Sequence, residues 1–405
     1  MTNPKIRFKQ ENCIDFPEWN QLQLNECCNC YDNMRKPIKE NLRQKGEYPY
    51  YGANGIQDYI DSYIFDGEFI LLAEDGGNFN DFHSKAIAKY ARGKFWVNNH
   101  AHIIQAKREF SNKFIFYSIE HKDIRSYING STRGKLTKSD MWNIKIGVPS
   151  SIREQQKIAS FFSTLDQKIE LNERKLEALE RLKKGVMQKI FSQEIRFKDS
   201  FGKSYPDWQQ FSFKDLFEFK SSNSLSRSKL NYSNGYIKNI HYGDILLKFP
   251  TVIREDSQLI PYINNDCMHR KFDILEKGDI IFADTAEDYT LGKAIEIGTE
   301  NITATAGLHT IVCKPKKHFS SGFLGYYLNS NCFHDQIVRL ATGTKVYSII
   351  KSNIVKTKLL IPASSQEQDK IAELFSSIDE KITLSNQKIK NLKELKKGFM
   401  QQMFI

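Results

Sequence analysis

Two stretches of the chain carry apolar residues at alternating spacings of four and three, with polar and charged residues between them. This period indicates the seam of a coiled coil. Each seam has one polar step at the same place, Asn172 or Ser385, a type of position that fixes the register of helix pairing at a cost in stability. The seam positions are Ile158, Phe162, Leu165, Ile169, Leu176 and Leu179 in the first stretch, and Ile371, Phe375, Ile378, Ile382, Ile389 and Leu392 in the second.

The two stretches are copies of each other. Residues 148–191 align without a gap on residues 361–404, at an offset of 213, and 22 of the 44 positions are identical. Each copy opens with a proline and a Ser-x-x-Glu spacing, which predicts a capping box in which serine and glutamate bond N–H groups at the helix start. The paired residues are Ser151 with Glu154, and Ser364 with Glu367.

A weaker repeat lies upstream of each copy. Residues 6–9 recur at 195–198, and Pro17-Glu18-Trp19 recurs as Pro206-Asp207-Trp208, both at an offset of 189. The offset reaches about 211 where Gly67 meets Gly278, so the extra residues of the second copy lie between about 211 and 278. The chain is therefore two copies of one unit, each a globular arm followed by a helix. The predicted boundaries are 1–148 and 195–361 for the arms, and 149–194 and 362–405 for the helices.

Each arm mixes strand-like runs such as residues 69–73 and 279–283 with turns and short helical patterns at 114–119 and 323–328. The predicted fold is α+β, with two globular domains separated by two long helices that form an antiparallel coiled coil with a pseudo-twofold internal repeat. The alternative is that each helix packs on its own arm. We favour helix pairing, because about 39 residues at 1.5 Å each make a rod of about 58 Å, longer than a small domain is wide.

Charge and cysteine usage narrow the class of protein. Lys and Arg number 59 against 48 Asp and Glu, a formal charge of +11, which favours a polyanionic partner. No run of 18 apolar residues and no apolar leader is present, so we expect a cytoplasmic protein that does not bind membranes. The cluster Cys27, Cys28 and Cys30 has one C-x-x-C spacing but no second pair, so buried thiols are favoured over a zinc site.

The loops of both arms are rich in side chains that read base edges or hold phosphates. For each residue, a tight turn or a solvated loop is at least as good an explanation. The candidates in the first arm are Tyr51, Asn54, Asn78, Asn98, His100, Arg133 and Lys135. The candidates in the second arm are Arg227, Lys229, Asn239, His241, Tyr242, Tyr289, Lys293, His309, Thr344 and Lys345.

One loop element precedes each helix, namely residues 130–135 and Gly343-Thr344-Lys345. Threonine, lysine and backbone N–H groups on a glycine turn suit a phosphate contact. The first copy is no nucleotide-binding P-loop, because three residues instead of four separate its glycines and Leu136 follows the lysine.

No catalytic motif is found. The sequence has no G-x-S-x-G, H-E-x-x-H or G-x-G-x-x-G pattern, and no Pro-Pro dipeptide such as the one in the motif of amino-methyltransferases. We therefore expect no catalytic residue, no metal and no cofactor on this chain, and chemistry supplied by a partner.

The chain resembles the specificity subunits of type I restriction-modification enzymes over essentially its whole length. The resemblance is carried by the twin Pro-started segments with Glu-Gln-x-Lys-Ile-Ala (154–159 and 367–372), by the heptads behind them and by the Pro-x-Trp entry to each arm. It implies two target recognition domains that each read half of a split, asymmetric site on double-stranded DNA, and a helical pair that sets the gap.

The resemblance also implies partners. These are two methyltransferase subunits that use S-adenosylmethionine to methylate adenine N6, and motor-nuclease restriction subunits that use ATP and Mg²⁺. A different hypothesis is a coiled-coil scaffold that binds DNA through charge alone. It predicts no sequence preference and a uniform, salt-sensitive affinity, and the unlike arms argue against it.

Overall fold

The computed structural model describes residues 4–11, 13–130, 134–255 and 258–404. Residue contacts divide the chain into two compact units. The first consists of Met1–Arg174 with Gln387–Ile405, and the second is Lys175–Asn386. Each unit therefore holds one arm and a part of both long helices, which differs from the linear order of arms and helices along the sequence.

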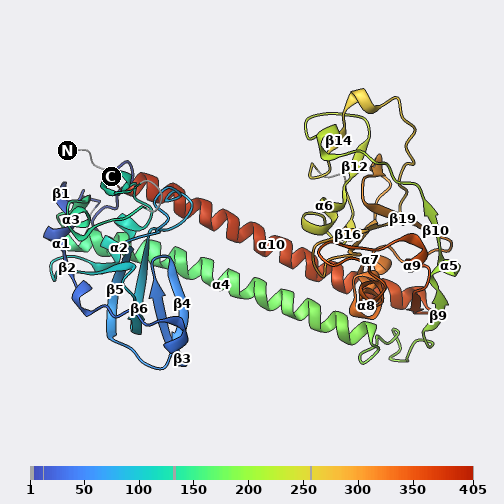
Figure 1. Cartoon of the computed structure of the whole chain (residues 1–405), viewed down its shortest axis with the longest axis horizontal. Coiled ribbons are helices and arrows are strands. Elements are labelled where there is room, and N and C mark those ends of the chain that lie inside the picture. The colour runs from blue at the N-terminus through green and yellow to red at the C-terminus, as the bar shows by residue number, and fades with distance from the viewer. Residues whose placement is uncertain (1–3, 12, 131–133, 256–257, 405) are drawn as a thin grey trace. The chain divides into compact units, whose positions relative to one another are not determined.

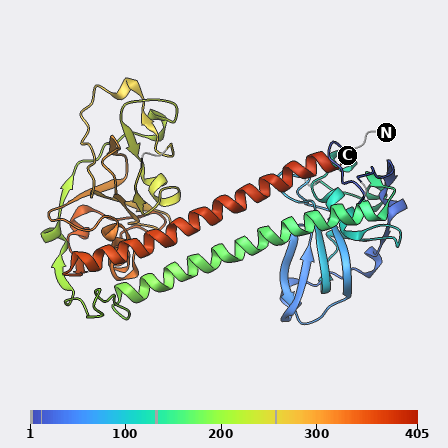
Figure 2. The same ribbon diagram turned by 180° about the vertical axis from the view of Figure 1, so that it is seen from behind.

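The two long helices are α4 (Ile152–Phe191) and α10 (Ser365–Met403), each a continuous ribbon (Figures 1 and 2). Within each unit their segments run antiparallel. In the first unit the ring of Phe162 lies 5.5 Å from that of Phe404, and Asp166 pairs with Lys396 at 2.8 Å. A later residue of α4 thus meets an earlier residue of α10, which confirms the predicted antiparallel coiled coil.

The second unit repeats these contacts with the helices exchanged. Phe191 stacks on Phe375 at 5.8 Å, and Lys183 pairs with Asp379 at 2.5 Å. Each of these residues lies 213 positions from its counterpart in the first unit. The sequence repeat is therefore also a repeat of contacts.

In each unit, a tyrosine of the arm contacts the ion pair between the two helices. The hydroxyl of Tyr117 donates to Asp166 at 2.8 Å, and that of Tyr326 donates to Asp379 at 3.0 Å. The ammonium groups of Lys396 and Lys183 lie 5.3 and 5.5 Å from the centres of these rings. Each arm is thereby joined to both helices.

Burial along the seam is strongest near the helix starts. Leu176, Leu179, Ile382 and Leu392 are half-buried, and the other predicted seam residues are buried. Phe162 shares a core with the first arm and Phe375 with the second. The alternative, that each helix packs on its own arm, therefore also holds for the first turns.

The arm of the first unit is built on a six-stranded sheet in the order β2-β7-β5-β6-β3-β4, and α2 packs against its central strands (Figure 1). The elements are β1 (Trp19–Gln23), α1 (Leu24–Cys27), β2 (Cys28–Cys30), η1 (Asp32–Met34), η2 (Glu40–Leu42), β3 (Lys45–Gly52), β4 (Gly55–Ile60), β5 (Phe65–Ala73), β6 (Ala88–Val97), β7 (Ala101–Ala106), α2 (Asn112–Glu120), η3 (Arg125–Tyr127), α3 (Lys138–Trp142) and β8 (Lys145–Pro149).

The arm of the second unit has a five-stranded sheet, β10-β19-β15-β17-β13, and a four-stranded sheet, β11-β14-β12-β18. The elements are β9 (Gln209–Ser212), α5 (Phe213–Leu216), β10 (Phe217–Lys220), η4 (Arg227–Lys229), β11 (Leu230–Asn231), β12 (Lys238–Ile240), α6 (Tyr242–Leu247), β13 (Val252–Ile253), β14 (Tyr262–Ile263), η5 (Asn265–Cys267), β15 (Ile280–Ala283), β16 (Thr285–Ala286), β17 (Ala294–Ile297), β18 (Ala304–Ala306), β19 (Thr310–Pro315), α7 (Phe323–Leu328), α8 (Asn331–Arg339), β20 (Tyr347–Ser348), α9 (Lys351–Ile354) and β21 (Lys358–Ile361).

One pair of neighbouring strands, β5 with β7 and β15 with β19, shows how the arms correspond. Ala73 pairs with Ala101 in the first arm, and Ala283 pairs with Thr310 in the second. The offset at these strands is therefore 210 and 209, one or two fewer than the sequence comparison gave. The elements between β10 and β15, including α6, are the predicted insertion in the second arm.

The prediction that Glu154 and Glu367 bond N–H groups at the helix starts is wrong. The carboxylate of Glu154, fully buried, accepts two hydrogen bonds from Arg7, at 3.0 and 2.9 Å, and one from the indole of Trp19 at 3.3 Å. Glu367 accepts the same bonds from Arg196 and Trp208. A buried carboxylate is stabilised far more by a guanidinium than by one backbone N–H, so the glutamate tethers the arm entry to the helix.

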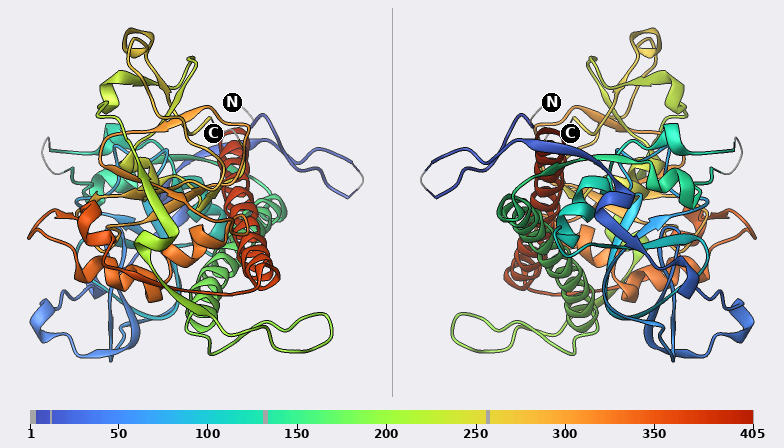
Figure 3. Two further views of the ribbon diagram at one scale, coloured as in Figure 1. Left: turned by 90° about the vertical axis from the view of Figure 1, so that its right-hand side faces the viewer. Right: turned by 90° about the vertical axis from the view of Figure 1, so that its left-hand side faces the viewer.

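The rest of the Glu-Gln-x-Lys motif makes further tethers. Gln155 accepts from the N–H of Ser111, next to the start of α2, and donates to the carbonyl of Pro149, both at 2.9 Å. Lys157 donates to the carbonyl of Lys9, at the base of the loop closed by the Lys9–Asp15 bridge, and Lys370 to that of Lys198, where the Lys198–Ser204 bridge closes the matching loop (blue and pale green in Figure 3). Each copy of the motif therefore joins one arm to the start of a long helix, which explains why the motif occurs twice.

Replacing Arg7 by methionine should destabilise the first unit by about 3 kcal/mol, because Glu154 would keep a buried charge without its cation. Equilibrium unfolding followed by tryptophan fluorescence measures the loss. The control is Lys9→Met, which breaks the exposed pair with Asp15 and should change stability by less than about 1 kcal/mol. Equal effects of the two variants would contradict a tethering role for Glu154.

Candidate nucleic-acid interface

In the first arm, three predicted loops meet at the end of β5. The N–H of Glu74 donates to the carbonyl of His100 at 2.9 Å, and the imidazole Nδ1 of His100 lies 2.7 Å from the Asp75 carboxylate. Asn54, in the exposed turn between β3 and β4, donates to the carbonyl of Gly76 at 3.0 Å. The turn, the residues after β5 and the residues before β7 therefore form one polar surface.

Other candidates support this surface from beneath. Asn98, with 4% of its area exposed, donates to Gln57 and accepts from the N–H of His100. Asn78 donates to the carbonyl of Ala86, and the half-buried Tyr51 packs on Phe95. Asn98 is thus buried beneath the surface, and its direct contact with a ligand stays a prediction.

The loop that precedes α3 reaches the same surface. Lys135 exchanges two backbone hydrogen bonds with Asn129, and its exposed ammonium lies 3.4 Å from Glu74. Arg133, another candidate, lies outside the described residues. Lys135 is thus held by backbone bonds while its charge stays accessible.

In the second arm, the matching strand ends carry a similar pair. The N–H of Asp284 donates to the carbonyl of His309 at 3.1 Å, and Nδ1 of His309 lies 3.3 Å from the Asp284 carboxylate. The ring of Tyr242, at the start of α6, lies 5.2 Å from the ring of His309 and 4.7 Å from that of His241. The structure therefore brings three predicted residues of the second arm together.

Arg227 joins this group through a buried carboxylate. Its guanidinium donates to both oxygens of Asp244, at 2.6 and 2.9 Å, while 43% of its side chain stays exposed. Burial alone would raise the pKa of Asp244, but Arg227 and Lys248 lower it below its usual value overall. Burial, and then Arg227, lowers the pKa of His241, whose Nδ1 accepts from the N–H of Gly243.

Four other candidates lie apart from this group or beneath the surface. Asn239 is fully buried in β12 and accepts from Asn223, so it supports the sheet, and its role as a contact residue stays a prediction. Lys293 donates to the carbonyl of Leu246, and burial lowers its pKa. Lys229 pairs with Asp266, and Tyr289 bonds Asp335.

The glycine loop of the second arm matches that of the first. Thr342 and Ser348 exchange two backbone hydrogen bonds, as Asn129 and Lys135 do 213 positions earlier. Gly343 has a φ of +118°, and a Cβ there would lie 2.0 Å from the carbonyl oxygen of Val346, so only glycine fits this turn. The turn leaves Thr344 and Lys345 exposed.

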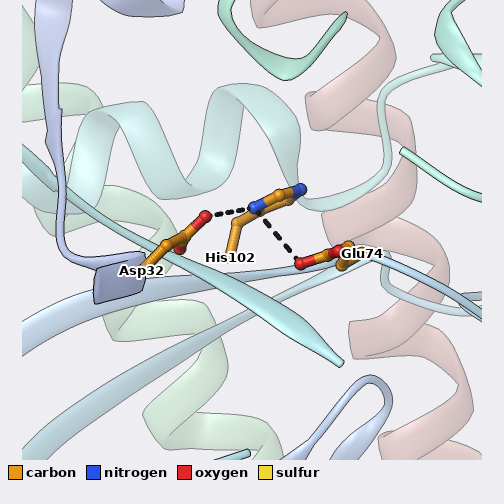
Figure 4. A group of neighbouring side chains, drawn as sticks. All are labelled: Asp32, Glu74 and His102. Carbon is orange, nitrogen blue, oxygen red and sulfur yellow. Dashed lines mark hydrogen bonds and ion pairs between the residues drawn. The ribbon is translucent and has the colours of Figure 1, made fainter. Parts of the chain in front are cut away.

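Asp32, Glu74 and His102 gather beneath the surface of the first arm (Figure 4). Nδ1 of His102 lies 2.6 Å from Asp32, and Nε2 lies 2.8 Å from the carbonyl of Leu136. The donor set could suit a metal, but Arg35 already contacts Glu74 at 2.5 Å and Asp32 at 3.4 Å through its guanidinium. A cation of the protein itself thus balances these carboxylates, and the group is better described as an ion network.

The cysteine cluster agrees with buried thiols. Burial raises the pKa of Cys27 and of Cys30 to about 11, and raises that of Cys28 as well. A zinc ligand must be a thiolate, which this apolar environment disfavours. Among the helices of the described residues, none is long and apolar enough to cross a membrane.

Comparison with known proteins identifies the family. The model of the type I restriction modification DNA specificity domain matches residues 17–181 and again residues 205–394. The chain belongs to this family. It is thus a DNA-recognition subunit of a type I restriction-modification system.

Individual specificity subunits agree with this assignment. The MjaVIII specificity subunit of Methanocaldococcus jannaschii is 25% identical over 97% of this chain and 94% of its own length. The putative subunit S.HindORF215P of Haemophilus influenzae is 39% identical, but over 34% of this chain and 35% of its own length. The crystal structure of an S subunit from M. genitalium has a TM-score of 0.66 at 15% identity, and covers 100% of this chain and 99% of that one, which shows a shared fold.

Several charged residues that support this specificity subunit's polar surfaces from beneath were not predicted from the sequence. These are Asp32, Arg35 and His102 in the first arm, and Asp244 in the second. His102 lies two residues after His100. Because alternate residues of a strand point to the same face, this spacing could have indicated His102 from the sequence. Arg35 and Asp244 lie in segments without a motif, and their roles come from contacts distant in sequence.

Asp32 gives the specificity subunit a pH-dependent contribution to stability. Burial raises the pKa of Asp32, but the hydrogen bond from His102, the N–H of Ile103 and Arg35 bring it below its usual 3.8. A carboxyl with a depressed folded-state pKa stabilises the fold above about pH 3.8, and this contribution disappears as the pH falls through the folded-state value.

Replacing Asp32 by asparagine should therefore cost roughly 2 kcal/mol at pH 7 and progressively less below about pH 3.8. Unfolding measured from pH 2 to pH 8 tests this, with the exposed Asp61→Asn as control. A cost that stays constant down to pH 2 would show that ionisation of Asp32 is not involved.

Proposed function

We propose that each arm of this specificity subunit reads one half of a split, asymmetric DNA site. The carrying observation is that two unlike polar surfaces occupy equivalent strand ends on one repeated scaffold. The surface around His100 is formed with Asp75 and Glu74, to which Asn54 and Lys135 are joined through Gly76 and Glu74, whereas His309 contacts Tyr242 and Thr285. Identical arms would suit a palindrome, and unlike arms suit two different half-sites.

Each arm enters the major groove with its loop surface. Exposed cations such as Lys135, Lys345 and Arg227 contact phosphates, and side chains such as Asn54 and Tyr242 reach base edges. The formal charge of +11 supports this, because neutralised phosphates supply much of the affinity of DNA-binding proteins.

The helical pair sets the gap between the half-sites and docks two methyltransferase subunits. Four leucines on the helices support docking, since exposed apolar groups at matched positions suit matched partners. They lie at offsets of 213 and are exposed by 68, 52, 63 and 47%, in the order Leu171, Leu182, Leu384 and Leu395.

The chemistry belongs to the partners. The methyltransferase subunits bring S-adenosylmethionine and methylate adenine N6, and motor-nuclease subunits use ATP and Mg²⁺ for restriction. This chain is non-catalytic and holds no cofactor. The absence of a catalytic motif in its sequence supports this division of labour.

A genome-wide map of N6-methyladenine, with the gene intact and deleted, tests the proposal. A two-part asymmetric motif should be methylated in the intact host and lose methylation on deletion. Restoring the gene is the control. An unchanged map in a host that expresses the methyltransferase subunits would contradict the proposal.

Removing one heptad from each helix tests the spacing role. Deleting residues 172–178 and 385–391 keeps the seams in register and shortens each helix by about 10 Å. The gap should shrink by about three base pairs, at about 3.4 Å each, or methylation should cease, while both half-site sequences stay the same. A changed base within a half-site would contradict the separation of spacing from reading.

A further inference from the structure

His100 and His309 are equivalent residues that the unlike arms have kept in common. Each directly precedes the strand that pairs with the central strand, β7 or β19, and each accepts from the N–H of the first residue after that central strand. Their offset of 209 equals that of β7 and β19. Together with the glycine loop before each long helix, this arrangement is common to two surfaces that otherwise carry different side chains.

A carboxylate orients each imidazole. Nδ1 of His100 lies 2.7 Å from Asp75. Nδ1 of His309 lies 3.3 Å from Asp284 and 3.3 Å from the hydroxyl of Thr285, which itself donates to Asp284 and can therefore accept from Nδ1. A carboxylate accepts and does not donate, so Nδ1 carries the proton, and the neutral form of the ring then has its lone pair on Nε2 as an acceptor. The two aspartates act as positioning residues.

Both imidazole rings are partly exposed. The side chains of His100 and His309 are exposed by 36 and 46%, and within the described part of the chain neither Nε2 has a hydrogen-bond partner. The backbone of His309 has a φ of +55°, a left-handed conformation that is uncommon for a residue with a side chain. The ring is thus held at the surface by backbone and carboxylate together.

A hydrogen-bond acceptor at Nε2 restricts which group of the DNA can bind there. A phosphate offers only hydrogen-bond acceptors, so the lone pair of Nε2 would repel it. The ammonium groups of Lys135 and Lys345 are better suited to contact a phosphate. In the major groove the donors on base edges are the amino groups of adenine N6 and cytosine N4. The chemistry therefore favours an amino-bearing base over a phosphate, a guanine or a thymine.

We propose that His100 and His309 each accept, through Nε2, a hydrogen bond from the amino group of one base, one in each half-site. This inference rests on the proposed reading of half-sites by the two arms. The neighbours of each histidine differ, so the same contact is placed within two different half-sites.

Paired substitutions separate this role from a structural one. In His100→Asn and His309→Asn, the amide can still donate to the aspartate, but the group at the Nε2 position is lost. In His100→Gln and His309→Gln, a polar group remains near the Nε2 position and the bond to the aspartate is lost. Arg108→Gln and His318→Gln, exposed beyond the far ends of β7 and β19, are the controls.

The variants are assembled with the methyltransferase subunits, and the methylated motif and the melting temperature of each complex are measured. Each asparagine variant should lose about tenfold or more of the discrimination at one base position, in one half-site only. That position should carry adenine or cytosine in the wild-type motif, which also distinguishes the two amino donors. The glutamine variants should keep more of the discrimination, and the controls should keep all of it.

The inference is overturned if the asparagine variants methylate the unchanged motif, or if the glutamine variants are the more defective, which would indicate a structural bond to aspartate. It is also overturned if only affinity falls, equally on all DNA. Because each arm has its own pair of variants, misfolding of one leaves the other as a test. A wild-type complex without a two-part motif would instead contradict the proposed function itself.

Discussion

The buried carboxylates of Glu154 and Glu367 are the contacts on which each arm's position depends. Each sits at the start of a long helix and accepts bonds from an arginine and a tryptophan that lie at the entry of the arm. A buried anion tolerates only a close and correctly oriented cation, so the entry strand has one place to lie against the helix. The glutamine and lysine that follow each glutamate fix two further points of the same arm.

This arrangement allows the arm surfaces to diverge. The tethers use backbone carbonyls and a few side chains near the helix start, and the polar surfaces lie at the strand ends beyond Ala73 and Ala283. The insertion that contains α6 changes the surface of the second arm without altering the tethers. A constant scaffold with variable loops is the usual way in which one fold serves several recognition tasks.

The sequence was sufficient to predict the long helices, their antiparallel pairing and the two-arm repeat, because heptads and a gapless copy are local signals. It was insufficient for Glu154, whose partner Arg7 is 147 residues away, and the local Ser-x-x-Glu spacing suggested a cap instead. For the surfaces, the loops around His100 and His309 were found by residue type. Their equivalence was hidden because the offset between the arms drifts from 189 to 213, and burial of Asn98 and Asn239 depends on packing that no local pattern encodes.

The division of both helices between the units affects the order in which the units can be completed during protein synthesis. The core of the first unit includes Phe404, whose ring lies 5.6 Å from that of Phe114, so residues made after the whole second arm complete a domain begun before it. Domains usually fold in order as they leave the ribosome, but the core of this one is complete only after the segment that begins at residue 387 has emerged. A premature stop codon shortly before residue 387 would therefore damage the N-terminal arm, and leave all residues of the second unit in place.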